Sequence, residues 1–505
     1  MVVFILDRFP VAVVAMGVAL SLWATGVLDL NQALAGFGDQ AVIFIAALFV
    51  VSESLDATGV TTWAGQLLIA RVGRSRSRLI VSMLLLVAFV TALISVNGAV
   101  AALLPVMVVT AVRLGRPPSQ LLMPLAFGAH AGSLLALTGS PVNVVASEYA
   151  HEFAGGSFGY FSFAVAGVPL VAGTIAIVLL AGPRLLPVRS PRSATRDFSN
   201  HLRALLEQYG LPDDAPLLGR SAGVVEVMIP PRSAPVGDRV FPGMTTESGE
   251  LVIVAVQRQG EDLPGETVLR VGDTLLLEGD WDALERQLAG PDVLVVDAPE
   301  LVRRQTVPLG PGAKRSLVIL AAMVLLLATN AIPPAAAGLL AAGAIVVTRV
   351  MTIEAAYRAI AWTTVILVAG MIPLSTAMTE TGAAARLADG LVNVVGDHGS
   401  YLLLLGLFVL TAVLGQLISN MATALILFPV AISAAADLDV SPRPLLMCVT
   451  VSAAAALLTP VATPANLMVM EPGGYRFTDY WKLGLPLLAL YGLVAVLVVP
   501  VFWPL

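Results

Sequence analysis

Two short polar elements recur in an otherwise apolar chain. Ser140-Pro141-Val142-Asn143 has a later counterpart in Thr463-Pro464-Ala465-Asn466. The number of residues from the first element to the second is the same as the number from Asn97 to Asn420, and we call this number the repeat interval. Hydroxyl and amide oxygens carry no fixed charge, and the backbone carbonyls that a proline frees from a helix add to them. Neutral oxygens suit a sodium ion, while the exposed N–H ends of half-helices favour an anion. These residue types therefore predict a small-ion site that needs no lysine or arginine.

The composition is that of a helical membrane protein. Of the 505 residues, 57% are hydrophobic and 12% are charged, and the mean hydropathy is +0.88. A soluble domain carries about 25% charged residues, whereas several runs here reach the ~20 apolar residues that cross a hydrocarbon core. The single cysteine, Cys448, excludes a disulfide framework or a cysteine-built metal site, and no basic cluster indicates nucleic acid. We expect an all-α polytopic membrane protein.

Some apolar runs predict simple crossings and two do not. Crossings are expected at 10–28, 40–57, 160–182, 317–331, 335–350, 361–378 and 480–503. Residues 79–112 are too long for one crossing and too short for two with a loop, and the uncharged turn Ser95-Val96-Asn97-Gly98 stands in their middle. This pattern is typical of a re-entrant hairpin. Residues 401–436 repeat the hairpin, with a tip at Ser419-Asn420.

Each hairpin is followed by a helix that a Ser/Thr-Pro-x-Asn element interrupts, at 119–150 and at 444–471. Proline removes an N–H donor and pushes the preceding residue out of the α region. Unwound backbone at membrane depth is tolerated only where it lines a cavity or is buried in protein. Two tips and two breaks that share one interval therefore predict a single central polar site.

Charge and symmetry predict the topology. If the hairpins do not cross, most arginines and lysines of the membrane part gather on one side, which is then cytoplasmic. Gly59 and Gly382, each behind a threonine, keep the repeat interval. An odd number of predicted crossings precedes the second copy, so the copy is inverted. We expect two inverted repeats in the inner membrane, residues 1–183 and 299–505.

Between the repeats the composition changes to that of a soluble, cytoplasmic domain. Residues 184–217 read as a linker with one short helix at 198–209, and residues 218–298 as a small α+β domain. Alternating hydrophobicity predicts strands at Val224–Ile229, Leu251–Gln257 and Thr274–Glu278, and a short helix at Trp281–Leu288.

With the repeats in place, the membrane part resembles the divalent anion/sodium symporter family (solute carrier family 13-like) of the ion transporter superfamily. The resemblance lies in Ala33-Leu34-Ala35-Gly36-Phe37, in both asparagine tips and in the two Pro-x-Asn elements. Residues 218–290 resemble the TrkA-C (RCK-C) domain, through Val225-Glu226-Val227, Leu251–Val256 and Val271–Gly279. The tips here read Ser-Val-Asn-Gly and Ser-Asn-Met, where the family commonly has Ser-Asn-Thr. The resemblance also implies that the family's first helix is missing before Phe9.

The resemblance implies a sodium-coupled elevator transporter that acts as a homodimer. Carried to this sequence, one sodium site would use Ser95, Asn97 and the carbonyl of Gly139, and the other Ser419, Asn420 and the carbonyl of Ala462. The anion, sulfate or a C4-dicarboxylate, would lie between the tips and the breaks. Its expected contacts are Asn97, Gly98, Ser140, Pro141, Asn143, Asn420, Met421, Thr423, Thr463, Pro464 and Asn466.

Several alternatives stay open at this point. The tip asparagines could merely cap helix ends, and Gln416 could line the site or only pack helices. His130, inside the first broken helix, could titrate and make coupling proton-driven, or be a neutral histidine that bonds to a neighbouring helix. The chain could instead be a cation/proton antiporter or a metalloid efflux carrier of the same superfamily, or a channel or receptor. The inserted domain could bind a small regulatory ligand or act only as a dimer clamp.

Overall fold

The structure is a computed structural model that describes residues 10–61, 63–64, 67, 75–114, 116–189, 222–259, 261–263, 265–288, 290–296, 309–329, 331–395 and 400–505. The chain divides into two compact units. One comprises Met1–Leu55, Ala64–Ala194 and Arg315–Leu505, and the other Asp56–Trp63 and Thr195–Lys314. Most of the predicted linker, including its short helix, lies outside the described residues.

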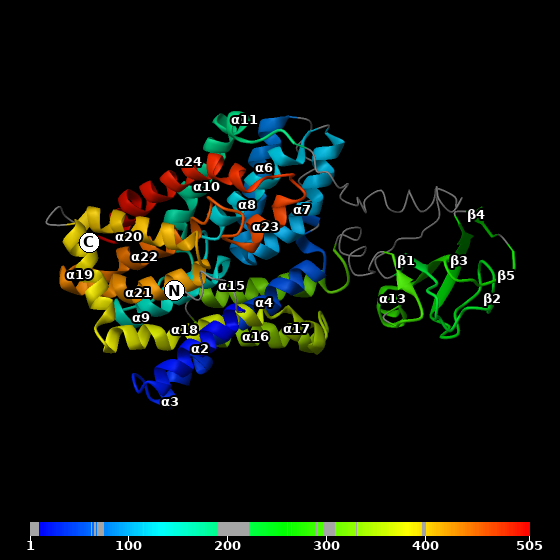
Figure 1. Ribbon diagram of the computed structural model, residues 1–505, viewed down its shortest axis with the longest axis horizontal. Coiled ribbons are helices and arrows are strands. Elements are labelled where there is room, and N and C mark those ends of the chain that lie inside the picture. Colours follow the sequence, from blue (N-terminus) through cyan, green and yellow to red (C-terminus); the bar gives the residue numbers. More distant parts are fainter. Residues whose placement is uncertain are drawn as a thin grey trace. The chain divides into compact units, whose positions relative to one another are not determined.

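The larger unit is built of apolar helices in two successive sets (Figure 1). The first set is α2 (Val11–Ala24), α3 (Leu30–Leu34), α4 (Gln40–Ala57), α6 (Arg76–Leu93), α7 (Val96–Arg113), α8 (Leu122–Gly132), α9 (Pro141–Phe153), α10 (Ala164–Leu180) and α11 (Gly182–Leu185). The second set is α15 (Ala313–Ala328), α16 (Pro334–Val347), α17 (Ile353–Ala359), α18 (Trp362–Glu380), α19 (Ala383–Val395), α20 (Ser400–Gly415), α21 (Asn420–Asp437), α22 (Pro442–Ala454), α23 (Pro464–Met470), α24 (Tyr480–Leu493) and α25 (Val499–Phe502).

The two sets repeat one design at the interval found in the sequence. The first residues of α2 and α16 are separated by the repeat interval, and so are those of α9 and α23. After α4 and α18 the chain turns through Gly59 and Gly382, whose φ angles are +71° and +69°. Only glycine adopts this left-handed conformation without strain. The predicted fold of two repeats, each with a helical hairpin and a broken helix, is confirmed.

Hydrophobic length supports membrane insertion of this unit. Five helical stretches of the described residues are long and apolar enough to cross a hydrocarbon core: Leu30–Ala57, Arg76–Leu93, Trp362–Glu380, Asn420–Asp437 and Phe477–Phe502. Further apolar helices are shorter, among them Ala164–Leu180 and Ser400–Gly415. Leucines on the outer faces, such as Leu180 and Leu325, are exposed in the chain by itself, as lipid-facing residues must be.

Helix α19 was not expected from the sequence. It follows Gly382 directly, and its residues Ala384 and Ala388 are fully buried while Leu387 is exposed. Ala384 and Ala388 are one helical turn apart, so small residues line the face that packs against α18, α20 and α21.

The smaller unit is a compact α+β domain. Its main sheet has the strand order β4-β3-β6-β1-β7, and all pairs are antiparallel. The strands are β1 (Ala222–Met228), β3 (Leu251–Arg258), β4 (Glu261–Asp262), β6 (Thr274–Asp280) and β7 (Leu294–Val295), and β2 (Arg239–Val240) pairs with β5 (Thr267–Val268). Helix α13 (Trp281–Gln287) covers the sheet with the buried ring of Trp281. The three long strands and the helix lie where the alternation of apolar residues predicts them.

Candidate functional site

Each hairpin tip is an N-cap formed by a serine. Ser95 Oγ accepts a hydrogen bond from the Gly98 N–H at 3.3 Å, at the start of α7. Ser419 Oγ accepts one from the Ala422 N–H at 3.3 Å, at the start of α21. The capping role considered for the asparagines thus belongs to the serines.

The two tips are not identical copies. Asn97 and Asn420 keep the repeat interval, whereas Ser95 and Ser419 do not, because Val96 is inserted between serine and asparagine in the first tip. Asn420 is therefore the first residue of its helix and Asn97 the second. Since successive helical residues point about 100° apart, the two asparagines leave their tips in different directions. Asn97 is exposed and Asn420 is half-buried.

Both broken helices are held open by an asparagine that lies three residues after the cap. Asn143 Nδ2 donates to the carbonyls of Ser133 (2.8 Å) and Ala136 (2.9 Å). In the second repeat, Asn466 Nδ2 donates to the carbonyls of Ala456 (2.8 Å) and Thr459 (3.1 Å).

These four carbonyls lie at the unwound stretches, where the regular helical hydrogen bonds end; the Ala136 oxygen also accepts the Gly139 N–H at 3.1 Å. Both asparagines are fully buried. In this conformation their amide groups satisfy the backbone at the break, which is a different task from the substrate contact expected for them.

The cap at each break is a hydroxyl residue just before the proline. Ser140 Oγ accepts from the Val142 N–H at 3.2 Å, and Thr463 Oγ1 from the Asn466 N–H at 3.3 Å. Ser140 is partly exposed and Thr463 is 8% exposed.

His130 links the two repeats. Its Nε2 lies 3.2 Å from Thr463 Oγ1 and 3.2 Å from Asn466 Oδ1, and the side chain is buried. Of the two roles considered for this residue, a histidine that bonds to a neighbouring helix matches these contacts.

Each hairpin is also bonded to the break of its own repeat, by different side chains. Thr138 Oγ1 donates to the Ala92 carbonyl at 2.7 Å at the end of α6 and lies 2.8 Å from the Tyr160 hydroxyl. In the second repeat Gln416 takes this role: its Oε1 accepts from the Leu458 N–H at 3.0 Å, and its Nε2 donates to the Ala455 and Ala412 carbonyls, each at 3.3 Å.

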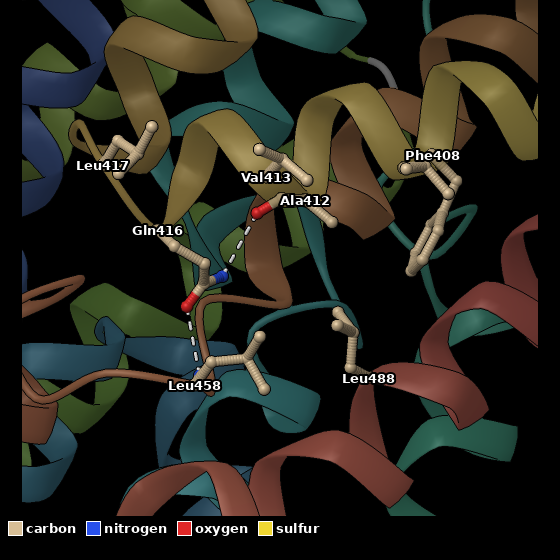
Figure 2. Close-up of a pocket in the computed structure, with 8 residues that line it drawn as sticks. Phe408, Ala412, Val413, Gln416, Leu417, Leu458 and Leu488 are labelled. Atoms are coloured by element: carbon tan, nitrogen blue, oxygen red, sulfur yellow. Dashed lines mark hydrogen bonds between the residues drawn. The ribbon is translucent and has the colours of Figure 1, made fainter. Parts of the chain in front are cut away.

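Figure 2 shows Gln416 between α20 and the unwound stretch, beside an apolar cavity of about 290 Å³. The cavity is lined by Phe408, Val409, Ala412, Val413, Leu417, Leu458 and Leu488 together with Gln416. A glutamine that bridges the hairpin and the break is a positioning residue, which the sequence alone left undecided. The sequence analysis did not predict a role for Thr138 or Tyr160. The only feature that could have indicated one is a polar side chain within an apolar segment.

The hairpins and broken helices pack across the repeats. Helix α7, which starts at the first tip, contacts α8 of its own repeat and α23 of the other. Helix α21, which starts at the second tip, contacts α22 of its own repeat and α9 of the other. Each tip helix therefore touches the second half of the opposite broken helix, as a single shared centre requires.

Several buried oxygens near the tips and breaks have no hydrogen-bond partner among the described residues. They are the side-chain oxygens Asn143 Oδ1, Asn420 Oδ1, Thr423 Oγ1 and Thr459 Oγ1. An unpaired buried oxygen costs about 1–3 kcal/mol, so each of these atoms is suited to a bound cation or water. No charged side chain lies between 131 and 143 or between 444 and 466, which leaves neutral oxygens as the available ligands.

The unwound stretches are packed against glycines. A Cβ on Gly167 of α10 would lie 2.2 Å from the Leu134 carbonyl oxygen, and one on Gly484 of α24 would lie 2.2 Å from the Leu457 carbonyl oxygen. Leu134 and Leu457 again keep the repeat interval. The helix after each break thus approaches the unwound backbone so closely that only glycine fits.

The chain was compared with known proteins. A model of the citrate transporter family (CitMHS) matches residues 1–439 and, in a second match, residues 376–504. The uncharacterized transporter YfbS of Escherichia coli is 31% identical over 100% of this chain and 97% of its own length. Sodium/sulfate cotransporter 2 of Chlamydomonas reinhardtii is 27% identical over 46% of this chain and 27% of its own length.

A solved structure of the Alcanivorax borkumensis YdaH transporter aligns over 94% of this chain and 88% of its own length, with a TM-score of 0.51 and 14% identity. At that identity the likeness concerns the fold. Repeated tips, repeated breaks and the family match lead to one conclusion: this chain is a membrane transporter, not an enzyme, and it belongs to the citrate transporter family of the ion transporter superfamily.

Proposed function

We propose that the protein is a sodium-coupled, secondary-active importer of a small divalent anion, sulfate or a C4-dicarboxylate. The single observation that carries the proposal is a repeated set of tips and breaks whose unpaired buried side-chain atoms are neutral oxygens, in stretches without a charged side chain. Neutral oxygens suit sodium, and half-helix N-termini stabilise an anion. The name of the sodium/sulfate cotransporter relative supports this choice of ions.

Each of the two proposed sodium sites consists of one hydroxyl, one side-chain amide and one backbone carbonyl. Ser95, Asn97 and the Gly139 carbonyl form the first, and Ser419, Asn420 and the Ala462 carbonyl form the second. The unpaired Oδ1 of Asn420 supports the second of these sites.

The anion would lie between the tips, near Gly98 and Met421, and would meet the caps Ser140 and Thr463 with their prolines. Thr423, whose hydroxyl is buried without a partner among the described residues, would line the same space.

Alternating access would occur by an elevator movement of the hairpins and broken helices, in a homodimer. The cross-repeat contacts of α7 with α23 and of α21 with α9 support a mobile part that moves as one body. The inserted TrkA-C-like domain would be cytoplasmic and would regulate transport through a small ligand.

Uptake by reconstituted protein tests the proposal. Proteoliposomes receive radiolabelled sulfate or succinate under an imposed sodium gradient, and separately under a proton gradient. We expect uptake with sodium alone, and its loss in Asn420→Ala with the protein still monodisperse in detergent. Uptake driven by protons alone would favour the antiporter-like alternative, and normal uptake by Asn420→Ala would refute the site.

A further inference from the structure

The hydrogen bonds of Asn466 determine the tautomer of His130. Asn466 Nδ2 donates to two backbone carbonyls, the Ala456 and Thr459 oxygens, so the atom that faces His130 is the amide oxygen. An amide oxygen only accepts hydrogen bonds. The ring nitrogen 3.2 Å away must therefore carry a proton, and His130 is an Nε2–H donor shared between Asn466 Oδ1 and Thr463 Oγ1.

This donor determines what Thr463 can do. A hydroxyl has one proton to donate and two lone pairs that accept. Thr463 Oγ1 accepts from the Asn466 N–H at 3.3 Å and from the His130 Nε2–H at 3.2 Å. Both acceptor positions are used, so the remaining capacity of Thr463 is to donate its proton. A donor binds an anion and repels a cation.

The first break lacks this arrangement, because the second repeat has no histidine at the equivalent position to reach it. The counterpart of His130, one repeat interval later, is Ala453, which cannot donate from its side chain. Ser140 Oγ accepts only the Val142 N–H from the described residues, and among those residues Asn143 Oδ1 stays buried without a partner. The cap hydroxyl of the first break therefore keeps a free lone pair, which can coordinate a cation.

We propose that His130 is a positioning residue that makes the two breaks chemically unequal. By donating to Thr463, it leaves the hydroxyl at the second break only the role of donor, which suits the anion. The second repeat has no histidine at the equivalent position to donate to Ser140 in return, so the hydroxyl at the first break keeps a lone pair that can also coordinate the cation. The assignment rests on the proposed function for the identity of the two ions, whereas the state of His130 and Thr463 follows from their hydrogen bonds alone.

The state of the ring can be measured without any substrate. The full chain, labelled with ¹⁵N in the rings of its 4 histidines and reconstituted in lipid, is examined by NMR, and the His130 signals are assigned by their loss in His130→Gln. We expect a proton on Nε2. A neutral ring protonated only at Nδ1 would overturn the inference whatever the protein transports.

Uptake variants test the consequence. The amide nitrogen of glutamine falls near the position of Nε2, whereas that of asparagine falls near Nδ1, so His130→Gln keeps the donor and His130→Asn removes it. We expect the KM for sulfate to rise about tenfold or more in His130→Asn and in Thr463→Val, the loss for one hydrogen bond to a charged group. His130→Gln and Thr463→Ser should stay near the wild-type value.

Ser140→Ala is the matched comparison at the first break, because we expect it to raise the sodium concentration for half-maximal uptake, which Thr463→Val should leave unchanged. Equal defects in His130→Gln and His130→Asn, a changed pH profile in His130→Gln, or a sodium rather than a sulfate defect in Thr463→Val would overturn the inference. If the wild-type chain takes up no sulfate while the NMR shows the Nε2–H ring, the proposed function fails and the assignment of His130 stands.

Discussion

Replacing the two break asparagines with alanine should separate their structural and transport roles. Asn143→Ala removes two hydrogen bonds, to the Ser133 and Ala136 carbonyls. Asn466→Ala removes two equivalent bonds and also the acceptor of His130. The two substitutions delete the same atoms from equivalent positions, so each variant is the control of the other.

The cost follows from the groups that lose their partner. A buried carbonyl without a partner costs about 1–3 kcal/mol. The Ala136 oxygen also accepts the Gly139 N–H, so Asn143→Ala leaves the Ser133 carbonyl without its partner, at about 1–3 kcal/mol. Asn466→Ala removes the partner of two carbonyls, at roughly 2–6 kcal/mol. Asn466→Ala also leaves the His130 Nε2–H with Thr463 as its only acceptor, which adds about 1 kcal/mol. Asn143 Oδ1 has no partner to lose among the described residues. Both variants should be destabilised, and Asn466→Ala should be destabilised more.

Thermal unfolding of the purified full chain in detergent measures this difference, with uptake recorded on the same preparations. A lower midpoint for both variants, with the lower one for Asn466→Ala, is the expected result. Unchanged midpoints in both, together with a raised substrate KM, would refute the structural assignment and return the asparagines to the substrate contacts predicted from the sequence. Equal destabilisation would refute the contribution of His130.

Three further outcomes are expected. Gln416→Leu should lower both thermal stability and uptake, because the Leu458 N–H loses its partner, at about 1–3 kcal/mol, and the Ala455 carbonyl keeps only the Leu457 N–H; Gln416→Glu, which still accepts from Leu458, should retain more of both. Gly139→Ala should abolish uptake, since its Cβ would lie 2.3 Å from a carbonyl oxygen, whereas Gly390→Ala, with no atom within 4 Å, should leave uptake unchanged. In the smaller unit, burial raises the pKa of Asp273, but its hydrogen bonds from Arg258 and from the backbone outweigh burial and lower the pKa below its ordinary value. The stability from this pair is therefore complete above pH ~4 and is lost as the pH falls through the lowered value; hydrogen exchange of residues 222–296 in the full chain should show this loss, and Asp273→Asn should remove it.

The repeat, its period and the positions of the tips and breaks could be predicted because backbone geometry demanded particular residues. Pro141 and Pro464, each behind a hydroxyl residue that caps a helix, stand at the first helical position, where proline is favoured, and Gly59 and Gly382 adopt positive φ. A run of about 20 apolar residues likewise indicates a transmembrane helix and is rare in soluble proteins. Each of these features depends on residues that are close together in the chain, so it can be recognised from the sequence alone.

The polar contacts could not be predicted, because they join residues far apart along the chain. His130 meets Thr463 and Asn466 only after both repeats have packed. The amide of Asn466 was expected at the substrate, since a sequence does not show which oxygen a side chain faces. Val96 separates the serine from the asparagine in the first tip but not in the second, and this difference became evident only when the serine caps were compared.

Positions that match between the two repeats and positions that differ have different consequences for the mechanism. Residues that keep the repeat interval, such as Asn143 with Asn466 and Pro141 with Pro464, hold the backbone in the same shape twice. At other equivalent positions one repeat has a polar side chain and the other an apolar one: His130 corresponds to Ala453, and Gln416 corresponds to Leu93. The backbone frame is the same in both halves and the polar contacts are not. If the protein binds a cation and an anion as proposed, the side chains that differ between the repeats would distinguish the two ions, and of these His130 is the one that contacts the other repeat.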